Sequence, residues 1–309
     1  SRSRQPAVRT LQSPADHRRT VGQVQDALPE QVSAAIAAAA AAFPAWDRSP
    51  ADQRAQCLEA AADQLEAHLG ELVALCCREA GKSIPDGIAE VREAADFCRY
   101  YAARAREAFA APLELPGPTG ERNQLSLHGR GVFVCISPWN FPLAIFTGQV
   151  AAALAAGNTV VAKPAEQTPL IAARAVELLR AAGVPDAALQ LLPGDGPSVG
   201  APLVADPRIA GVAFTGSVAT AQRINRQLAE RNGPIVPLIA ETGGQNAMVV
   251  DASALPEQVV GDVLQSSFQS TGQRCSALRV LYIQEDIAER MLTMLAGAMA
   301  ALQIGDPWD

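Results

Sequence analysis

The chain has 309 residues, enough for two domains or one large one, and its 49% hydrophobic and 18% charged residues are typical of a globular protein with a buried core. A net charge of −7 gives no electrostatic support for nucleic-acid binding. No apolar run reaches the roughly 18–20 residues of a membrane span, and the polar start Ser1-Arg-Ser-Arg-Gln-Pro6 does not resemble a secretory signal.

The first predicted elements are helices, between residues 29 and about 101. One long helix opens at Ser49-Pro50, and its apolar residues recur at spacings of three to four from Leu58 to Cys76. Gly81 is suited to end that helix, and a further helix is predicted over residues 87–109.

Prolines and glycines between residues 112 and 120 break the chain, and the alternating run 123–128 then predicts a strand, half of a hairpin. From Gly131 the pattern alternates between short apolar runs and helical stretches. The runs are typical of buried parallel strands: 132–136, 159–162, 189–192, 209–214, 235–240 and 248–250. Helices are predicted between most of them, over 143–156, 170–182 and 218–231.

This order predicts an α/β fold, a doubly wound Rossmann-like parallel sheet preceded by N-terminal helices. After Asp251 we expect a helix to about residue 271, a strand over 279–283 and a helix to residue 302, as the start of a second α/β domain. The chain then stops where we expect the middle of a domain.

Six cysteines are present, and no pair has zinc-ligand spacing with histidines nearby. We therefore expect no metal site, a reducing cytoplasmic compartment, and five structural thiols with one functional one. A buried cysteine is usually a packing residue, so Cys275 stands out only through its neighbours.

The run Ser137-Pro-Trp-Asn-Phe-Pro142 follows a predicted strand, at the edge of the sheet where ligands bind in such folds. Two prolines make this loop rigid. The Asn140 amide on it is a candidate donor to an oxyanion. The alternative is that Asn140 caps the next helix.

A second strand ends in Lys163-Pro164, with Glu166 close behind. Lys163 and Glu166 are candidates to bind ribose hydroxyls, and an acid at that place repels a 2′-phosphate, which favours NAD over NADP. The alternative is a solvated salt bridge on a loop.

A third strand ends in Thr215-Gly-Ser217 before a helix. Gly216 permits close backbone approach, Ser217 adds a hydroxyl, and a helix N-terminus favours an anion, so this turn is a candidate phosphate site. It lacks the three-glycine dinucleotide fingerprint. The alternative is an ordinary strand-to-helix turn.

The last motif pairs Glu241, which follows a predicted buried strand, with Cys275 in the run Gly272-Gln-Arg-Cys-Ser276. A thiol attacks a carbonyl carbon, and a carboxylate can activate the water that releases the product. We expect Cys275 near the start or end of a helix, where its thiolate fraction would rise.

Together and in this order, these runs resemble the aldehyde dehydrogenase superfamily over essentially the whole chain. The resemblance implies Cys275 as nucleophile, Glu241 as general base and Asn140 as oxyanion donor. It implies NAD as cofactor, with contacts from Lys163, Glu166, Gly216, Ser217, Pro138 and Trp139. Ala221 stands where many members carry a second glycine.

The runs 129–149 and 272–279 look like the dehydrogenase module of bifunctional proline utilisation A enzymes, which oxidises L-glutamate γ-semialdehyde to glutamate. Ser276 is similar to the serine with which such enzymes bond the substrate's α-carboxylate. The resemblance also implies a proline dehydrogenase domain in the full-length protein and a homo-oligomer when complete. Motifs that the family carries further on have no counterpart before residue 309.

We therefore expect an NAD-binding domain over residues 1–240, with a hairpin or bridging segment at about 113–131, and an incomplete catalytic domain over 241–309. The alternatives are an NAD-binding fragment without turnover, an aldehyde dehydrogenase of other specificity, and an acylating or thioester-forming relative. Glu241 argues against the last, because acylating enzymes do not need to activate water.

Overall fold

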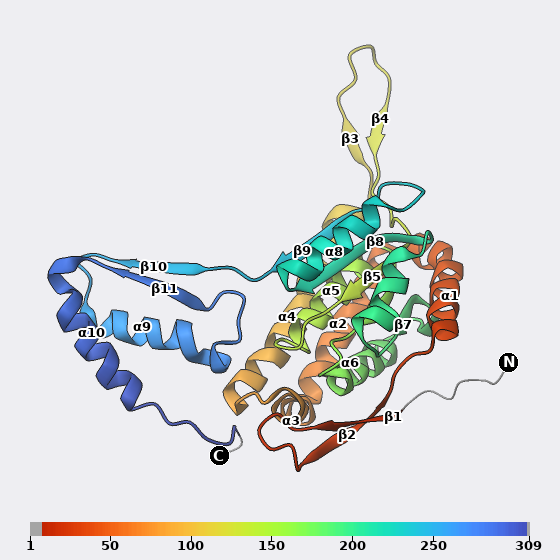
Figure 1. The fold of residues 1–309 in the computed structure, drawn as a ribbon. Coiled ribbons are helices and arrows are strands. Elements are labelled where there is room, and N and C mark those ends of the chain that lie inside the picture. The colour runs from red at the N-terminus through yellow and green to blue at the C-terminus, as the bar shows by residue number, and fades with distance from the viewer. Residues whose placement is uncertain (1–7, 308–309) are drawn as a thin grey trace. The chain divides into compact units, whose positions relative to one another are not determined.

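The computed structural model describes residues 8–307, and the chain divides after Glu241 into two compact units (Figure 1). Within the described range, no helix combines the length and apolar character needed to cross a membrane.

The first unit begins with a helical layer, α1 (Pro29–Arg48), α2 (Ala51–Ala67), α3 (Leu69–Ala80) and α4 (Ile84–Phe109). The prediction of a single helix from Ser49 to Gly81 is wrong. The segment forms two helices, α2 and α3, which are separated at His68 because its φ of −101° and ψ of 20° are not helical. Gly81 ends α3 in the left-handed conformation, as predicted. Helix α4 begins earlier than predicted, since the Ser83 hydroxyl caps it by accepting from the Asp86 N–H.

The predicted doubly wound sheet is confirmed. Its five strands run in the order β7-β6-β5-β8-β9, with β5 (Val132–Ile136), β6 (Thr159–Lys163), β7 (Leu189–Leu191), β8 (Ile209–Gly216) and β9 (Leu238–Thr242). Between them lie α5 (Ala144–Ala155), α6 (Pro169–Ala181), α7 (Ala201–Ala205), α8 (Val218–Ala229) and the short η1 (Asp186–Ala188) and η2 (Gly196–Gly200).

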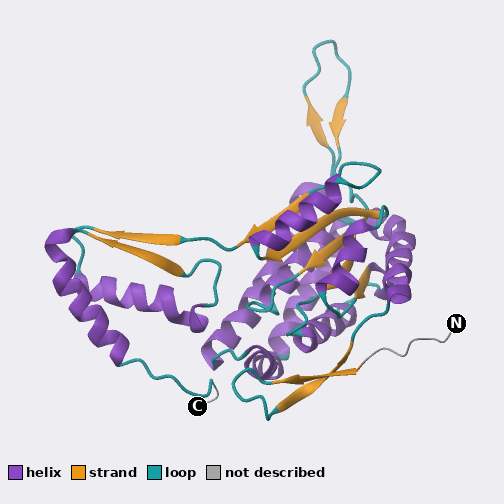
Figure 2. Cartoon of the chain, in the orientation of Figure 1, coloured by secondary structure: helices purple, strands orange, loops and turns teal. Residues whose placement is uncertain are grey.

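Helices lie on both faces of this sheet (Figure 2), and a hydrophobic core fills the space on each face. Residues of α2 to α6 pack on one face around Phe146 and Leu154. Residues of α1, α7 and α8 pack on the other, around Ile36 and Leu203. The central strand β5 contributes to both cores, which explains its unbroken apolar run.

Strand β9 differs from the expected buried strand. It starts at Leu238 rather than residue 235, after Pro237, which has no N–H to donate but accepts from Val212 N at 3.0 Å. Ile239 is 56% exposed, as an edge strand allows. Glu241 lies within β9, not after it.

Two small antiparallel pairs lie outside the large sheet of this unit. β3 (Leu113–Leu115) and β4 (Asn123–Leu125) form the predicted hairpin. β1 (Val8–Gln12) and β2 (Thr20–Gln25) form a second ribbon that our reading of the sequence did not include.

The second unit has its own parallel sheet, in which β10 (Asn246–Val250) pairs with β11 (Leu278–Ile283). The predicted strand at 248–250 therefore exists, but it is not part of the large sheet. Helices α9 (Pro256–Phe268) and α10 (Glu285–Ala300) pack on it around Val250 and Met291, and the short η3 (Gln269–Gly272) follows α9.

Buried charges from the helical layer satisfy the ends of the helices that follow β5 and β6. Glu90 of α4 accepts from the N–H groups of Leu143 and Ala144 at 3.2 and 2.8 Å, at the start of α5. Glu79 of α3 accepts from Leu170 and Ile171 at 2.7 and 2.9 Å, at the start of α6. A carboxylate at a helix N-terminus satisfies free donors and complements the helix dipole.

Burial raises the pKa of Glu79 from its ordinary 4.5 to about 7, although the two backbone donors oppose the shift. The folded protein therefore keeps a proton that the unfolded chain releases, so the free energy of unfolding falls as the pH rises through this window. We expect wild type to lose about 2 kcal/mol relative to Glu79→Gln between about pH 5 and pH 8 in urea unfolding. Parallel pH curves for the two proteins would contradict this expectation.

Candidate active site

The carboxyl ends of three neighbouring strands meet at one edge of the large sheet. Ile136 at the end of β5 pairs with Lys163 of β6 on one side and with Phe214 of β8 on the other. The Ser137 N–H continues the ladder to the Lys163 carbonyl at 3.2 Å. The parallel register thus brings the predicted residues of three motifs, from Pro138 to Ser217, to the same edge.

The loop that follows β5 carries Asn140. Pro138 is buried, Trp139 is 42% exposed and Asn140 is half-buried. Leu143 occupies the N-cap position of α5, so the alternative that Asn140 caps this helix is wrong. A rigid loop holding a half-buried amide is consistent with an oxyanion donor.

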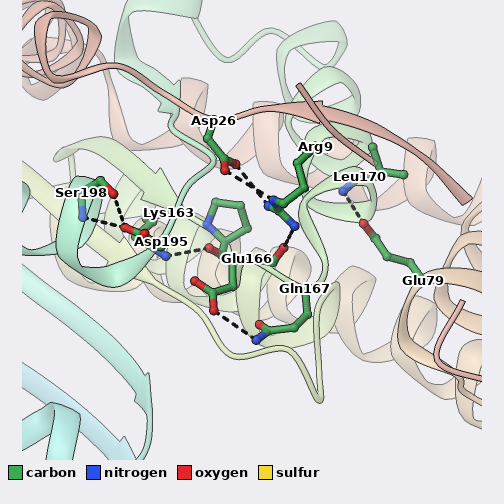
Figure 3. A network of polar contacts seen from close by, with 10 residues as sticks. Arg9, Asp26, Glu79, Lys163, Glu166, Gln167, Leu170, Asp195 and Ser198 are labelled. Carbon is green, nitrogen blue, oxygen red and sulfur yellow. Dashed lines mark hydrogen bonds and ion pairs between the residues drawn. The ribbon is translucent and has the colours of Figure 1, made fainter. Parts of the chain in front are cut away.

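Lys163 is the last residue of β6, and only 5% of its surface is exposed (Figure 3). Its ammonium donates to the Pro164 carbonyl at 3.1 Å, the one hydrogen bond it makes among the described residues. Burial lowers its pKa, while the charges of Glu166 and Asp195 oppose the shift. A solvated salt bridge is therefore wrong for Lys163, whereas Glu166 is exposed.

Our reading of the sequence missed the charged residues around this lysine. Arg9 of β1 donates to the Glu166 carbonyl at 2.8 Å and pairs with Asp26 at 3.2 Å, so the N-terminal ribbon holds the loop after β6 (Figure 3). Asp195 accepts from the Ser198 hydroxyl and from the Ser198 N–H, the latter at 2.6 Å, and these two bonds hold its pKa low. A local sequence pattern could not predict the contact between Arg9 and Glu166, because these residues are 157 positions apart in the sequence.

The turn after β8 has the predicted strand, Gly-Ser, helix form. A Cβ on Gly216 would lie 2.6 Å from the ring of the buried Phe214, so only glycine fits there. Ser217 is the N-cap of α8, and its hydroxyl accepts from Thr220 N at 3.2 Å. The remaining first-turn N–H groups of this helix are the ones an anion would use.

Cys275 and Ser276 lie in the second unit, both exposed. Cys275 lies in a turn between the end of the short helix η3 and the start of β11, rather than at the end of an α-helix. The side-chain amide of Asn246 donates to the carbonyls of Cys275 and Ala277 at 2.7 and 3.0 Å, which fixes this turn to the start of β10. Our sequence reading did not identify Asn246.

The backbone before the thiol is unusual. Ser270 and Thr271 have φ of 54° and 55°, and Gly272 follows with φ 68°. Positive φ is costly for residues with a Cβ and tends to occur at functional sites. Arg279 donates to the Gly272 carbonyl at 2.8 Å and holds this segment in place.

Comparisons with known proteins agree on one family. The family model described as "Aldehyde dehydrogenase family" matches residues 3–309. The bifunctional protein PutA of Escherichia coli K12 is 52% identical over 96% of this chain and 22% of its own length. A 1-pyrroline-5-carboxylate dehydrogenase of Bacillus mycoides is 37% identical over 96% of this chain and 58% of its own.

A solved structure gives the same result. The structure titled as 1-pyrroline-5-carboxylate dehydrogenase from Thermus with bound NAD has a TM-score of 0.94 and 34% identity, covering 98% of this chain and 59% of that one. The chain therefore spans between about a fifth and three fifths of the length of these relatives.

Exposure should make Cys275 the most reactive of the six thiols. Cys275 is exposed, Cys57 is half-buried and the other four are buried. Burial raises the pKa of Cys57 and Cys77, and raises that of Cys98 and Cys135 to about 12. Because the thiolate is the reactive form, iodoacetamide near neutral pH should modify Cys275 first, as peptide mass spectrometry would report. The Cys275→Ser variant is the control, and first labelling at Cys57 would contradict the prediction.

Proposed function

Because the chain belongs to the aldehyde dehydrogenase family, we propose that it oxidises L-glutamate γ-semialdehyde to L-glutamate with NAD as the hydride acceptor. The observation that carries this proposal is the exposed thiol of Cys275, held in a fixed turn by Asn246. The first unit would bind the cofactor and the second would supply the nucleophile. The relatives named 1-pyrroline-5-carboxylate dehydrogenase support the choice of substrate.

The reaction begins at Cys275. Its thiolate adds to the aldehyde carbon, and the Asn140 amide donates to the oxygen on which negative charge develops. Loss of hydride from the tetrahedral adduct leaves a thioester on Cys275. Glu241 then takes a proton from water, the water attacks the thioester carbon, and the carboxylic acid leaves as the thiol is restored.

The cofactor proposal depends on the edge of the large sheet. The buried Lys163 ammonium has three donors and uses one on Pro164, which leaves donors for ribose hydroxyls. The exposed Glu166 carboxylate stands three residues on. Ser217 and the first turn of α8 would hold the pyrophosphate, with Pro138 and Trp139 beside the cofactor. When bound, NAD would accept the hydride.

A second candidate function is NAD binding without turnover. The chain spans 58% of the length of the Bacillus mycoides relative. The name of the bifunctional relative is consistent with a proline dehydrogenase domain elsewhere in the full-length protein.

Glu166 should set the preference for NAD over NADP. A carboxylate repels a 2′-phosphate, so Glu166→Gln should narrow the affinity gap between the two cofactors by about tenfold, an effect near 1.4 kcal/mol. Calorimetric titration of both cofactors measures the gap. Glu230→Gln removes an exposed carboxylate from the other end of α8 and should leave it unchanged. Equal affinities in wild type would exclude the role of Glu166.

Ser276 should distinguish the semialdehyde from simple aldehydes. A hydrogen bond to a charged group contributes about 1.5–3 kcal/mol, so a Ser276 hydroxyl that donates to the α-carboxylate should favour the semialdehyde over propanal. We expect Ser276→Ala to raise KM for L-glutamate γ-semialdehyde by about tenfold and KM for propanal much less. Steady-state NADH production measures both, and equal changes for the two substrates would remove Ser276 from substrate recognition.

A further inference from the structure

A buried ion pair lies behind the loop of residues 137–142. Lys82 joins α3 to α4, and Glu90 lies on α4. The Lys82 Nζ and the Glu90 Oε1 are 2.8 Å apart, with the side chains 4% and 0% exposed. Removing two charges from water is costly, so such a pair persists only where further contacts stabilise it.

Glu90 contacts the end of the loop directly. Its other oxygen, Oε2, accepts from Leu143 N at 3.2 Å and from Ala144 N at 2.8 Å. Negative charge at a helix N-terminus is favourable, and these two bonds fix where the chain enters α5. The loop of residues 137–142 is therefore anchored at its C-terminal end.

Lys82 contacts the loop through an aromatic ring. Its ammonium lies 4.1 Å from the centre of the Phe141 ring, well within the range of a cation–π contact. Phe141 is the neighbour of Asn140 in the chain. Lys82 is one of only two lysines among 25 basic residues, and both are buried.

The backbone holds Lys82 in place. Gly81 has φ +66°, and its N–H donates to the Cys77 carbonyl at 3.0 Å, while Lys82 N donates to Cys76 O at 3.4 Å. A left-handed Gly81 whose N–H donates four residues back is the αL type of helix end, and it closes α3. Ser83 then caps α4, so Lys82 is fixed between two helix ends.

We propose that Lys82 and Glu90 are positioning residues that set the direction of the Asn140 amide. The loop would be held at its start by the bond from Ser137 N to the Lys163 carbonyl and at its end by this pair, with Asn140 between them. The part of the inference that concerns catalysis rests on the proposed role of Asn140 as oxyanion donor.

The test uses a neutral double variant, Lys82→Met with Glu90→Gln. Changing one partner alone would leave an unpaired buried charge, whereas neutralising both is far better tolerated. The matched control is Glu59→Gln with Arg106→Met, which removes a half-exposed ion pair between α2 and α4. Lys82→Arg is a second test variant, which keeps the charge but places a larger group beside Phe141.

Trp139 reports on the loop without any need for activity. The sequence has three tryptophans, so fluorotryptophan labelling gives three fluorine resonances, and Trp139→Phe assigns the relevant one. We expect this resonance to shift or broaden in both Lys82 variants and to remain in place in the control. The Trp46 resonance and a cooperative melt establish that the fold is intact.

Steady-state rates of aldehyde oxidation by the protein that contains this sequence test whether the Lys82–Glu90 pair affects catalysis. We expect kcat of the double variant to fall by about tenfold or more with KM within about threefold, because an oxyanion donor acts in the transition state. An unmoved Trp139 resonance in Lys82→Arg and in a folded double variant would overturn the inference, as would an unchanged kcat. Failure of wild type to oxidise any aldehyde would overturn the proposed function instead.

Discussion

The edge of the sheet that carries the predicted site depends on how the ends of one buried helix are satisfied. Most residues of helix α5 are buried, so its terminal backbone groups need hydrogen-bond partners within the protein. Glu90 accepts from its first turn, and the Arg54 guanidinium donates to the Ala155 carbonyl at its last turn at 3.1 Å. Each charge has the sign that complements its end of the helix dipole. Because both come from the helical layer, that layer fixes where α5 lies and where the preceding loop ends.

The same arrangement recurs at the next strand. Glu79 satisfies the start of α6, and the loop before α6 carries Lys163 and Glu166. On the outer side of that loop, Arg9 donates to the Glu166 carbonyl. The loops after β5 and β6, which we propose to bind ligands, are thus each held at one end by hydrogen bonds to helices that contribute no catalytic group. Rigid scaffolds commonly hold functional loops in this way.

Periodicity and turn residues predicted most of the elements, because burial and backbone chemistry act locally. Gly81 ended a helix and the apolar run of β5 marked a central strand for that reason. Local patterns failed where another part of the chain decides the outcome, as for the exposure of Ile239 on an edge strand. They also could not show that Arg9 reaches Glu166 or that Asn246 holds Cys275, since such contacts leave no periodic trace. The candidate site residues were proposed from chemically distinctive short motifs, whereas no motif pointed to the residues that support them.

The long sequence separation of the helix caps has a consequence for how the protein is made. Glu90 precedes its partners in α5 by 53 and 54 residues, and Glu79 precedes those in α6 by 91 and 92. During synthesis from the N-terminus, the acceptors leave the ribosome before the helices that need them. A chain permuted to begin at β5 would reverse this order, because α5 and α6 would be synthesised before the carboxylates that satisfy their first turns.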